Sequence, residues 1–336
     1  MYKRQIYENA VKTLFPVETY FEDNYDENAG SVWVDSEYMF SMAEEDKKPA
    51  TQTDEGVVEA GAAVCPWPLQ ENAAGNVYNI ADLKNYDFLM KFYTVTSITS
   101  LTTQIMRPEE FLAKDLSLEK NADLPQILIF HTHSQEGFVD TVEGDTSTTI
   151  VGVGDYLTDI LTNTYGYNVY HDTSVYDYVD GKLDRSKAYT YAEENVAKIL
   201  EENPSIEVVI DLHRDGVPDT TRLVTEEKGV TMSKVMFFNG ISYSKAKGDI
   251  GSLYNANRDD NLAMSLQMYL LGEAYYPGLL RNIYINAYRY CLHMKGRSML
   301  IEAGAQTNTS TEVKNAMIPV ADMLDRLLRG EKAYTQ

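Results

Sequence analysis

Short runs of apolar residues alternate with amphipathic segments along the C-terminal two thirds of the chain. The apolar runs are typical of strands covered on both faces, and we expect strands at 126–130, 167–171, 207–212, 234–238 and 298–302. The segments between them have helical spacing, and we expect helices at 151–161, 188–203, 261–275 and 312–328. Strands that alternate with helices of about 10–16 residues indicate βαβ units. The pattern therefore predicts an α/β fold with a mostly parallel, twisted sheet flanked by helices.

The first third of the chain lacks this alternation. Residues 1–60 carry 14 acidic and five basic side chains, and the polar stretch 41–60 within them predicts a linker or loop. Helical spacing is found at 6–15 and again at 79–92. We therefore predict three parts. They are an irregular, acidic N-terminal accessory or linker segment at 1–80, a helical lead-in at 81–124, and a domain at 125–332 that carries the candidate chemistry.

Charge and composition exclude several classes of partner. The chain of 336 residues has 29 Lys and Arg against 51 Asp and Glu, a net charge of −22, which argues against binding to nucleic acid or to an anionic membrane surface. The apolar runs are far shorter than the ~20 residues of a spanning helix, and no signal-peptide pattern opens the chain. Cys65 and Cys291 have no motif spacing, so we expect two free, small apolar side chains.

Histidines and carboxylates follow three of the predicted strands. His131, His133 and Glu136 follow the first strand, His213 follows the third, and Glu302 ends the last. Ligands of open α/β sheets bind beyond the carboxyl ends of the strands, so we expect these side chains to meet at one edge. Imidazoles and carboxylates around an open position are typical of catalytic zinc, which activates water whose proton a carboxylate then moves. The sequence predicts a Zn²⁺ hydrolase site.

The other motifs point to no competing chemistry. The chain contains no G-x-S-x-G elbow, no Walker loop and no G-x-G-x-x-G after a strand, and nothing near either cysteine supports a Cys–His hydrolase. We expect His171 to lie at the surface. His293, just before the last strand, could orient a ligand or contact substrate.

Taken together, these motifs resemble those of the stage II sporulation protein P (SpoIIP) family. The resemblance runs from about residue 86 to 328 and rests on the segments His131-Thr132-His133-Ser134-Gln135-Glu136, 153–157, Ile210-Asp211-Leu212-His213-Arg214-Asp215, 276–281, 288–290 and 300–308. The family is similar in fold to the zinc N-acetylmuramoyl-L-alanine amidases, a phosphorylase/hydrolase-like architecture, so the domain at 125–332 would be the catalytic amidase domain.

The resemblance also implies a biological role. It implies cleavage of the amide between N-acetylmuramic acid and the L-alanine of the stem peptide, and for some members of peptide cross-links as well. The implied partners are peptidoglycan glycan strands with their stem peptides and a SpoIID-like lytic transglycosylase. The role would be septal wall removal during engulfment. The implied location is extracytoplasmic, at the septal or forespore membrane, through an N-terminal anchor that this chain lacks.

Metal ligands can be assigned from the same resemblance. His133 and His213 match the two imidazole ligands, and His131 would either replace His133 or orient it. Glu136 belongs to the family motif and is the expected carboxylate ligand. Glu143 or Asp145, farther along the same loop, is the alternative from the wider amidases.

Catalytic roles follow in the same way. Glu302 matches the catalytic glutamate, expected to act as general base and then general acid, although an Arg297 or Arg214 partner could make it structural. Arg214 would stabilise the developing oxyanion or bind a stem-peptide carboxylate. Asp211 and Asp215 are candidates for holding the His213 tautomer.

Two other functions are compatible with these residues. A non-catalytic peptidoglycan-binding module would keep the groove of a degenerate amidase site without turnover. A metal-dependent deacetylase of wall sugars would use the same types of ligand. The presence of both histidine motifs together with Glu302 favours the amidase.

Overall fold

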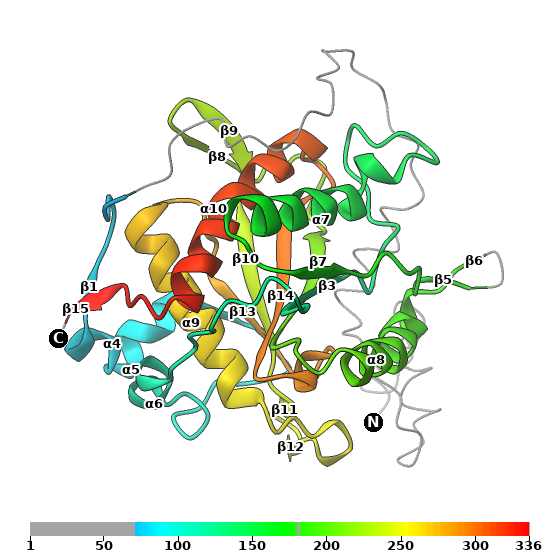
Figure 1. The fold of residues 1–336 in the computed structure, drawn as a ribbon. Coiled ribbons are helices and arrows are strands. Elements are labelled where there is room, and N and C mark those ends of the chain that lie inside the picture. The colour runs from blue at the N-terminus through cyan, green and yellow to red at the C-terminus, as the bar shows by residue number, and fades with distance from the viewer. Residues whose placement is uncertain (1–70, 180–181, 336) are drawn as a thin grey trace, which may run out of the picture.

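A seven-stranded sheet forms the centre of the molecule (Figure 1). The computed structural model describes residues 71–179 and 182–335, so the predictions for 6–15, 41–60 and Cys65 lie outside the described residues. The strand order is β2-β13-β10-β14-β7-β3-β4. The strands are β2 (Tyr93–Val95), β3 (Ile127–Phe130), β4 (Val169–His171), β7 (Val208–Asp215), β10 (Val235–Gly240), β13 (Ile283–Asn286) and β14 (Arg297–Ala305). Each neighbouring pair is parallel except β10–β14, which confirms the predicted mostly parallel sheet.

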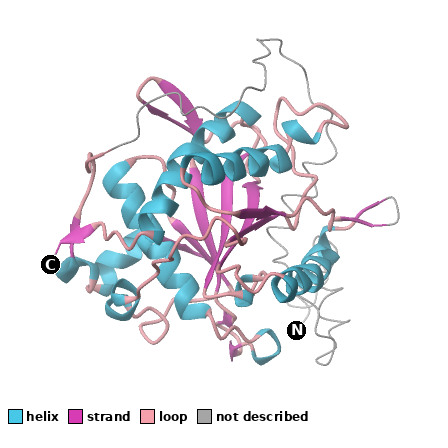
Figure 2. Ribbon diagram, in the orientation of Figure 1, coloured by secondary structure: helices cyan, strands magenta, loops and turns pink. Residues whose placement is uncertain are grey.

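Helices flank this sheet (Figure 2). They are α4 (Ile80–Leu83), α5 (Tyr86–Leu89), α6 (Pro108–Ala113), α7 (Ile150–Asp159), α8 (Arg185–Glu202), α9 (Arg258–Tyr275) and α10 (Ser310–Leu328). Short 3-10 or π turns are η1 (Met90–Phe92), η2 (Thr146–Thr148), η3 (Ile160–Thr164), η4 (Gly251–Leu253) and η5 (Leu292–Met294). The four long helices lie where the apolar spacing predicts them. The stretch 79–92 is instead broken into short pieces, because the Asn85 side chain accepts a hydrogen bond from the Phe88 amide (3.0 Å) and starts a new helix.

Four small two-stranded sheets complete the architecture. They are β1 (Tyr78–Asn79) with β15 (Tyr334–Thr335), β5 (Tyr178–Val179) with β6 (Lys182–Leu183), β8 (Val224–Glu227) with β9 (Val230–Ser233), and β11 (Tyr243–Ser244) with β12 (Gly248–Asp249). The β1–β15 pair brings the two ends of the described chain together (Figure 1).

Side-chain capping determines where the helices next to the candidate site begin. The Asp184 carboxylate accepts from the Lys187 amide at the start of α8, and Thr149 accepts from the Val151 amide at the start of α7. Thr309 and Glu312 form a complete capping box at the start of α10. Each cap satisfies a backbone N–H that has no partner inside its helix.

The alternation of side chains along the central strands sorts them between two cores. Ile129, Ile210 and Ile301 belong to the larger core, which also contains the buried faces of α7, α9 and α10. Their neighbours Val209 and Leu300 face the other way and pack in the smaller core with α8. Since successive side chains of a strand point to opposite faces, α8 covers one face of the sheet and the other long helices cover the opposite face.

The segment 81–124 packs on the larger core. Leu83, Leu89 and Phe111 are fully buried there, and β2 adds an edge strand to the main sheet through β13. The described helices include none that is both long and apolar enough to cross a bilayer.

Candidate functional site

The candidate catalytic side chains lie on the α8 face of strands β7 and β14. Both strands extend farther than the sequence pattern predicts, so His213 lies within β7 rather than after it, and Glu302 lies inside β14 rather than at its end. The parallel ladder places Glu302 directly opposite His213. Neighbouring strands are about 4.8 Å apart, and residues in register share a face. Asp211, two residues before His213, points to the same face.

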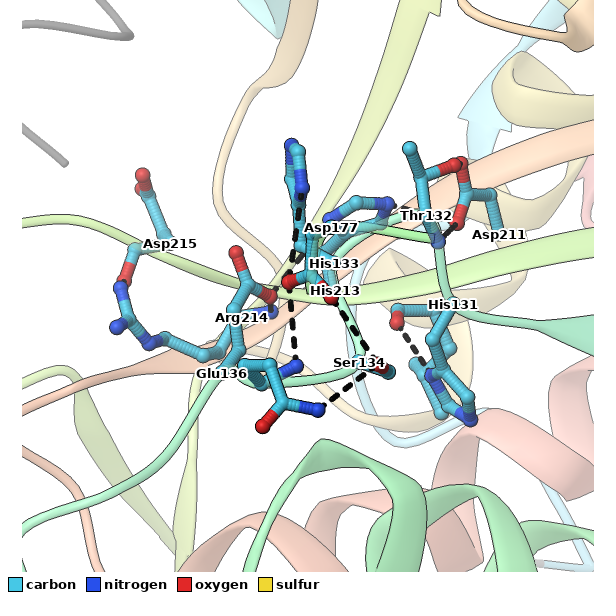
Figure 3. A network of polar contacts seen from close by, with 12 residues as sticks. His131, Thr132, His133, Ser134, Glu136, Asp177, Asp211, His213, Arg214 and Asp215 are labelled. Atoms are coloured by element: carbon cyan, nitrogen blue, oxygen red, sulfur yellow. Dashed lines mark hydrogen bonds and ion pairs between the residues drawn. The ribbon is translucent and has the colours of Figure 1, made fainter. Parts of the chain in front are cut away.

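His133 lies beside His213 at the exit of β3 (Figure 3). Their ring centroids are 5.3 Å apart and nearly perpendicular. We call these two residues the imidazole pair. Glu136 completes the group, with its Oε2 3.6 Å from His213 Nδ1. The structure thus brings together three of the residues that the sequence proposes as metal ligands.

Asp211 ties the two imidazole-bearing segments together. Its Oδ1 lies 2.7 Å from His213 Nε2, as a close ionic contact rather than an aligned hydrogen bond. The same carboxylate accepts from the Thr132 amide (2.9 Å) and hydroxyl (2.6 Å). Burial alone would lower the pKa of His213, but the Asp211 and Glu136 carboxylates outweigh it and raise that pKa well above its usual value.

The electrostatic surroundings of His133 are different. Burial, the Arg185 guanidinium and His213 together lower the pKa of His133 well below its usual value. Its ring is fully buried, and neither ring nitrogen has a hydrogen-bond partner within the described part of the chain. An uncharged imidazole with free nitrogens is the form that binds a metal ion.

Glu136 is held as a carboxylate. It accepts from the Arg214 amide (2.9 Å) and pairs with the Arg185 guanidinium (3.3 Å). Burial would raise the pKa of Glu136, but its contact with His213 and the charges of Arg214 and Arg185 lower it instead. The alternative carboxylates lie elsewhere: Glu143 is exposed, and Asp145 caps η2 through Ser147.

His131 is engaged on the opposite face of the sheet, apart from the imidazole pair (Figure 3). Its Nδ1 lies 2.8 Å from the Leu212 carbonyl, and its Nε2 lies 2.8 Å from Nε2 of His171. Nδ1 of His171 in turn contacts Asp155 of α7 at 2.9 Å. Both nitrogens of His131 are therefore occupied, whereas those of His133 are not. His171 is an internal partner rather than the surface residue that the sequence suggests, and its side chain is 7% exposed.

Arg214 points away from the imidazole pair (Figure 3). Its guanidinium donates to the carbonyl oxygens of Gly137 (3.1 Å) and Asp215 (3.4 Å), as expected of the residue after His213 on a strand. Asp215 contacts Arg281 rather than His213. Arg297, the other candidate partner of Glu302, pairs with Glu207 at 3.2 Å.

Sequence reasoning missed the residues that cover this group. Tyr189 of α8 lies against both imidazoles, with ring centroids 5.5 Å from His133 and 6.4 Å from His213. Asp177 lies 4.0 Å from His133 Nδ1 and accepts from the Gln135 amide and the Ser134 hydroxyl. Burial raises the pKa of Asp177. These residues, like Arg185, lie outside the strand ends, and the sequence carries no local signal for them.

The candidate ligands are of the chemical types that bind zinc, but in the described residues they do not converge as the ligands of a metal site do. Two buried imidazoles and a carboxylate are suitable zinc ligands, and His133 offers two nitrogens without a hydrogen-bond partner in the described residues. However, no group of three or more His, Cys, Asp or Glu side chains within 71–179 and 182–335 converges as a metal site. Instead, the Glu136 carboxylate forms an ion pair with the Arg185 guanidinium.

Comparison with known proteins yields relatives in sequence and structure. A family model described as Stage II sporulation protein P (SpoIIP) matches residues 23–325. The stage II sporulation protein P of Bacillus subtilis (strain 168) is 24% identical over 230 residues, which cover 64% of this chain and 54% of that protein. The chain thus spans about half the length of this curated relative.

Solved structures give a more distant likeness. The amidase AmiC2 of Nostoc punctiforme is 12% identical with a TM-score of 0.34, over 62% of this chain and 97% of that one. Ami1 of Mycobacterium smegmatis is 13% identical with a TM-score of 0.36, over 61% and 97%. Both are N-acetylmuramoyl-L-alanine amidases by name.

Proposed function

This chain belongs to the stage II sporulation protein P (SpoIIP) family, and on that premise we propose that it is a zinc-dependent peptidoglycan hydrolase of sporulation. Its target is the amide between N-acetylmuramic acid and the L-alanine of the stem peptide. The observation that carries the proposal is the meeting of His133, Glu136, His213 and Glu302 on one face of the sheet. Cleavage of peptide cross-links is a second activity to be tested.

His133, His213 and Glu136 are the proposed zinc ligands. His133 is chosen over His131 because both nitrogens of His131 are already engaged, with Leu212 and His171. A zinc ion there would supply a Lewis acid that polarises the scissile carbonyl and acidifies a water molecule. Asp211 orients the His213 ring, in the manner of the carboxylates that support zinc-binding histidines.

Glu302 is the proposed general base and acid. It projects from β14 on the face that carries His213, its register partner on β7, and we assign to it the proton of a water molecule at the imidazole pair. Glu302 takes the proton of the attacking water and returns it to the departing alanine amine, a positioned transfer worth about 10²–10⁴ in rate. Arg214 is proposed to position Glu136, because its backbone amide donates a hydrogen bond to the Glu136 carboxylate while its guanidinium points away from the imidazole pair.

The place of action follows from the family premise. We propose that the protein works outside the cytoplasm on septal peptidoglycan, held at the septal or forespore membrane by an N-terminal anchor. A SpoIID-like lytic transglycosylase would cut the glycan strands that this hydrolase strips of peptides. The net charge of −22 agrees with a partner other than nucleic acid.

Digestion of purified peptidoglycan tests the proposal. The wild-type protein with zinc should release stem peptides with a free L-alanine amine, identified by mass spectrometry. The Glu302→Gln variant should release them at least ~10²-fold more slowly. Glu109→Gln, whose carboxylate pairs with Lys84 on the surface, is the matched control and should match the wild type. Deacetylated sugars with intact amides, or binding without release by the wild type, would refute the amidase assignment.

A further inference from the structure

The candidate site is closed. The side chains of His133, His213 and Glu136 are 0% exposed, and Glu302 is 1% exposed. A hydrolase must bring the bond that it cuts against such groups, and a wall polymer is far too large to enter a sealed interior. Some covering element therefore has to move before the site can act.

The N-terminal half of α8 covers the site through two side chains. Arg185, at the first position of the helix, pairs with Glu136 at 3.3 Å. Tyr189, one turn later, lies edge-on to His133 and parallel to His213, at interplanar angles of 84° and 11°. Residues four apart lie on the same side of a helix. One face of α8 thus contacts all three proposed metal ligands.

A second set of contacts holds α8 in this place. Glu193, one further turn along, pairs with Arg289 and lies 3.4 Å from Nε2 of His293. The ring of Tyr189 also meets Tyr290 edge-on, with centroids 5.4 Å apart. We call the contacts of Glu193 with Arg289 and His293 the latch, because they join α8 to the loop before β14.

The loop before β14, which carries Arg289 and His293 of the latch, has a strained backbone. Tyr290 and Cys291 both have left-handed conformations, with φ of 49° and 51°. Side chains with a Cβ adopt this region rarely, and surrounding contacts must hold it. Here the Cys291 thiol contacts the Tyr189 carbonyl at 3.7 Å, so α8 and the strained turn support each other.

We infer that the N-terminal half of α8 is a lid that regulates the proposed site, closed by Arg185 and Tyr189 and held by the latch. In the closed state the Arg185 guanidinium is paired with the Glu136 carboxylate, which a metal ion would need as a ligand. A divalent cation beside that guanidinium would be repelled by it. Metal binding and lid closure therefore oppose each other, and by linkage each weakens the other to the same degree.

Footprinting of histidines tests the lid without any reference to activity. Diethyl pyrocarbonate modifies accessible, uncharged imidazoles, and peptide mass spectrometry measures the rate at His133 in the metal-free full chain, normalised to the denatured protein. Glu193→Gln weakens the latch without touching the site, and we expect the rate at His133 to rise about fivefold, as for loss of a partly buried ion pair. Glu194→Gln changes an exposed neighbour on the same helix and should leave the rate unchanged.

Arg289→Gln provides a second latch variant, from the other side of the contact. It should raise the rate at His133 as Glu193→Gln does, while His131, buried and engaged on both nitrogens, stays protected. Circular dichroism should show that each variant remains folded. Equal rates at His133 in the wild type and in both folded latch variants would overturn the lid.

This inference rests on the proposed function, which includes a bound metal ion. A measurement of zinc affinity therefore tests the metal site separately from the lid. In competition with a chromophoric chelator, Arg185→Gln should bind Zn²⁺ on the order of tenfold more tightly than the wild type, since it frees the Glu136 carboxylate. Faster labelling of His133 in the latch variants without zinc binding in any variant would uphold the lid and reject the zinc site. Unchanged labelling together with tight zinc binding by the wild type would reject the lid and uphold the site.

Discussion

Gly154 offers a direct test of how α7 supports the site. It lies on the buried face of α7, against the His131–His171 contact. A Cβ at this position would lie 2.6 Å from His171 Nε2 and 2.7 Å from His131 Nε2. His131 is fully buried and bonded to the Leu212 carbonyl, directly before His213. The Gly154→Ala substitution therefore forces apart either the two rings or α7 and the sheet.

The cost can be estimated from comparable changes. Adding a methyl group to a packed interior costs about 1–3 kcal/mol. Replacing a helical glycine with alanine returns about 0.5–1 kcal/mol in propensity. The two ranges leave a net loss of about 0–2.5 kcal/mol of unfolding free energy for Gly154→Ala, and contacts below 3 Å with both imidazole rings favour the upper half of that range. Gly251→Ala is the matched control, since a Cβ there meets nothing within 4 Å, and its effect should stay within about 0.5 kcal/mol.

Urea denaturation followed by circular dichroism measures both variants. The midpoint should fall for Gly154→Ala at an unchanged m-value, which marks a change in stability rather than in the unfolded state. A Gly154→Ala protein as stable as the Gly251→Ala control would refute the claim that the two rings are held against α7.

Three further outcomes follow from the structure. Thr309→Ala removes the N-cap of α10 and should cost about 1 kcal/mol in urea denaturation; an unchanged midpoint would contradict the capping box. Asp322→Asn removes the carboxylate that Arg326 pairs with at 2.7 Å, while the Glu331 carboxylate stays beside the guanidinium at 3.2 Å, and should cost about 1.5–3 kcal/mol by the same assay; a loss below about 0.5 kcal/mol would contradict this prediction. Dialysis against a chelator should abolish the proposed release of stem peptides, and added zinc should restore it; full activity in the chelator would argue against any metal.

The sequence pattern predicts the centre of the fold well because its strands are buried on both faces. The runs that became β3, β7 and β14 are almost purely apolar, and their helices have clear spacing. The carboxyl ends of β7 and β14 are harder to predict, because polar residues such as His213 join the strand through pairing with a neighbouring strand, here with Glu302 of β14, which also pairs with Met236 of β10. The sequence pattern does not predict the edge strand β2 or its neighbour β13, since three or four residues give too little alternation to recognise.

The candidate site was predictable only where its residues follow the strands. The motifs identify His133, Glu136, His213 and Glu302 as candidates. The relative positions of these four residues support the proposed hydrolase site. The choice between His131 and His133 could not be made from spacing, because it depends on which sheet face each ring meets. That face is defined by His171, a distant partner in the sequence.

Zinc stoichiometry in single-histidine variants tests the central claim most directly. Each purified protein is loaded with excess zinc, desalted and measured by elemental mass spectrometry. The account predicts one zinc ion per wild-type chain, none in His133→Ala or His213→Ala, and one in His131→Gln. Zinc retained by His133→Ala but lost from His131→Gln would contradict the proposed metal ligands.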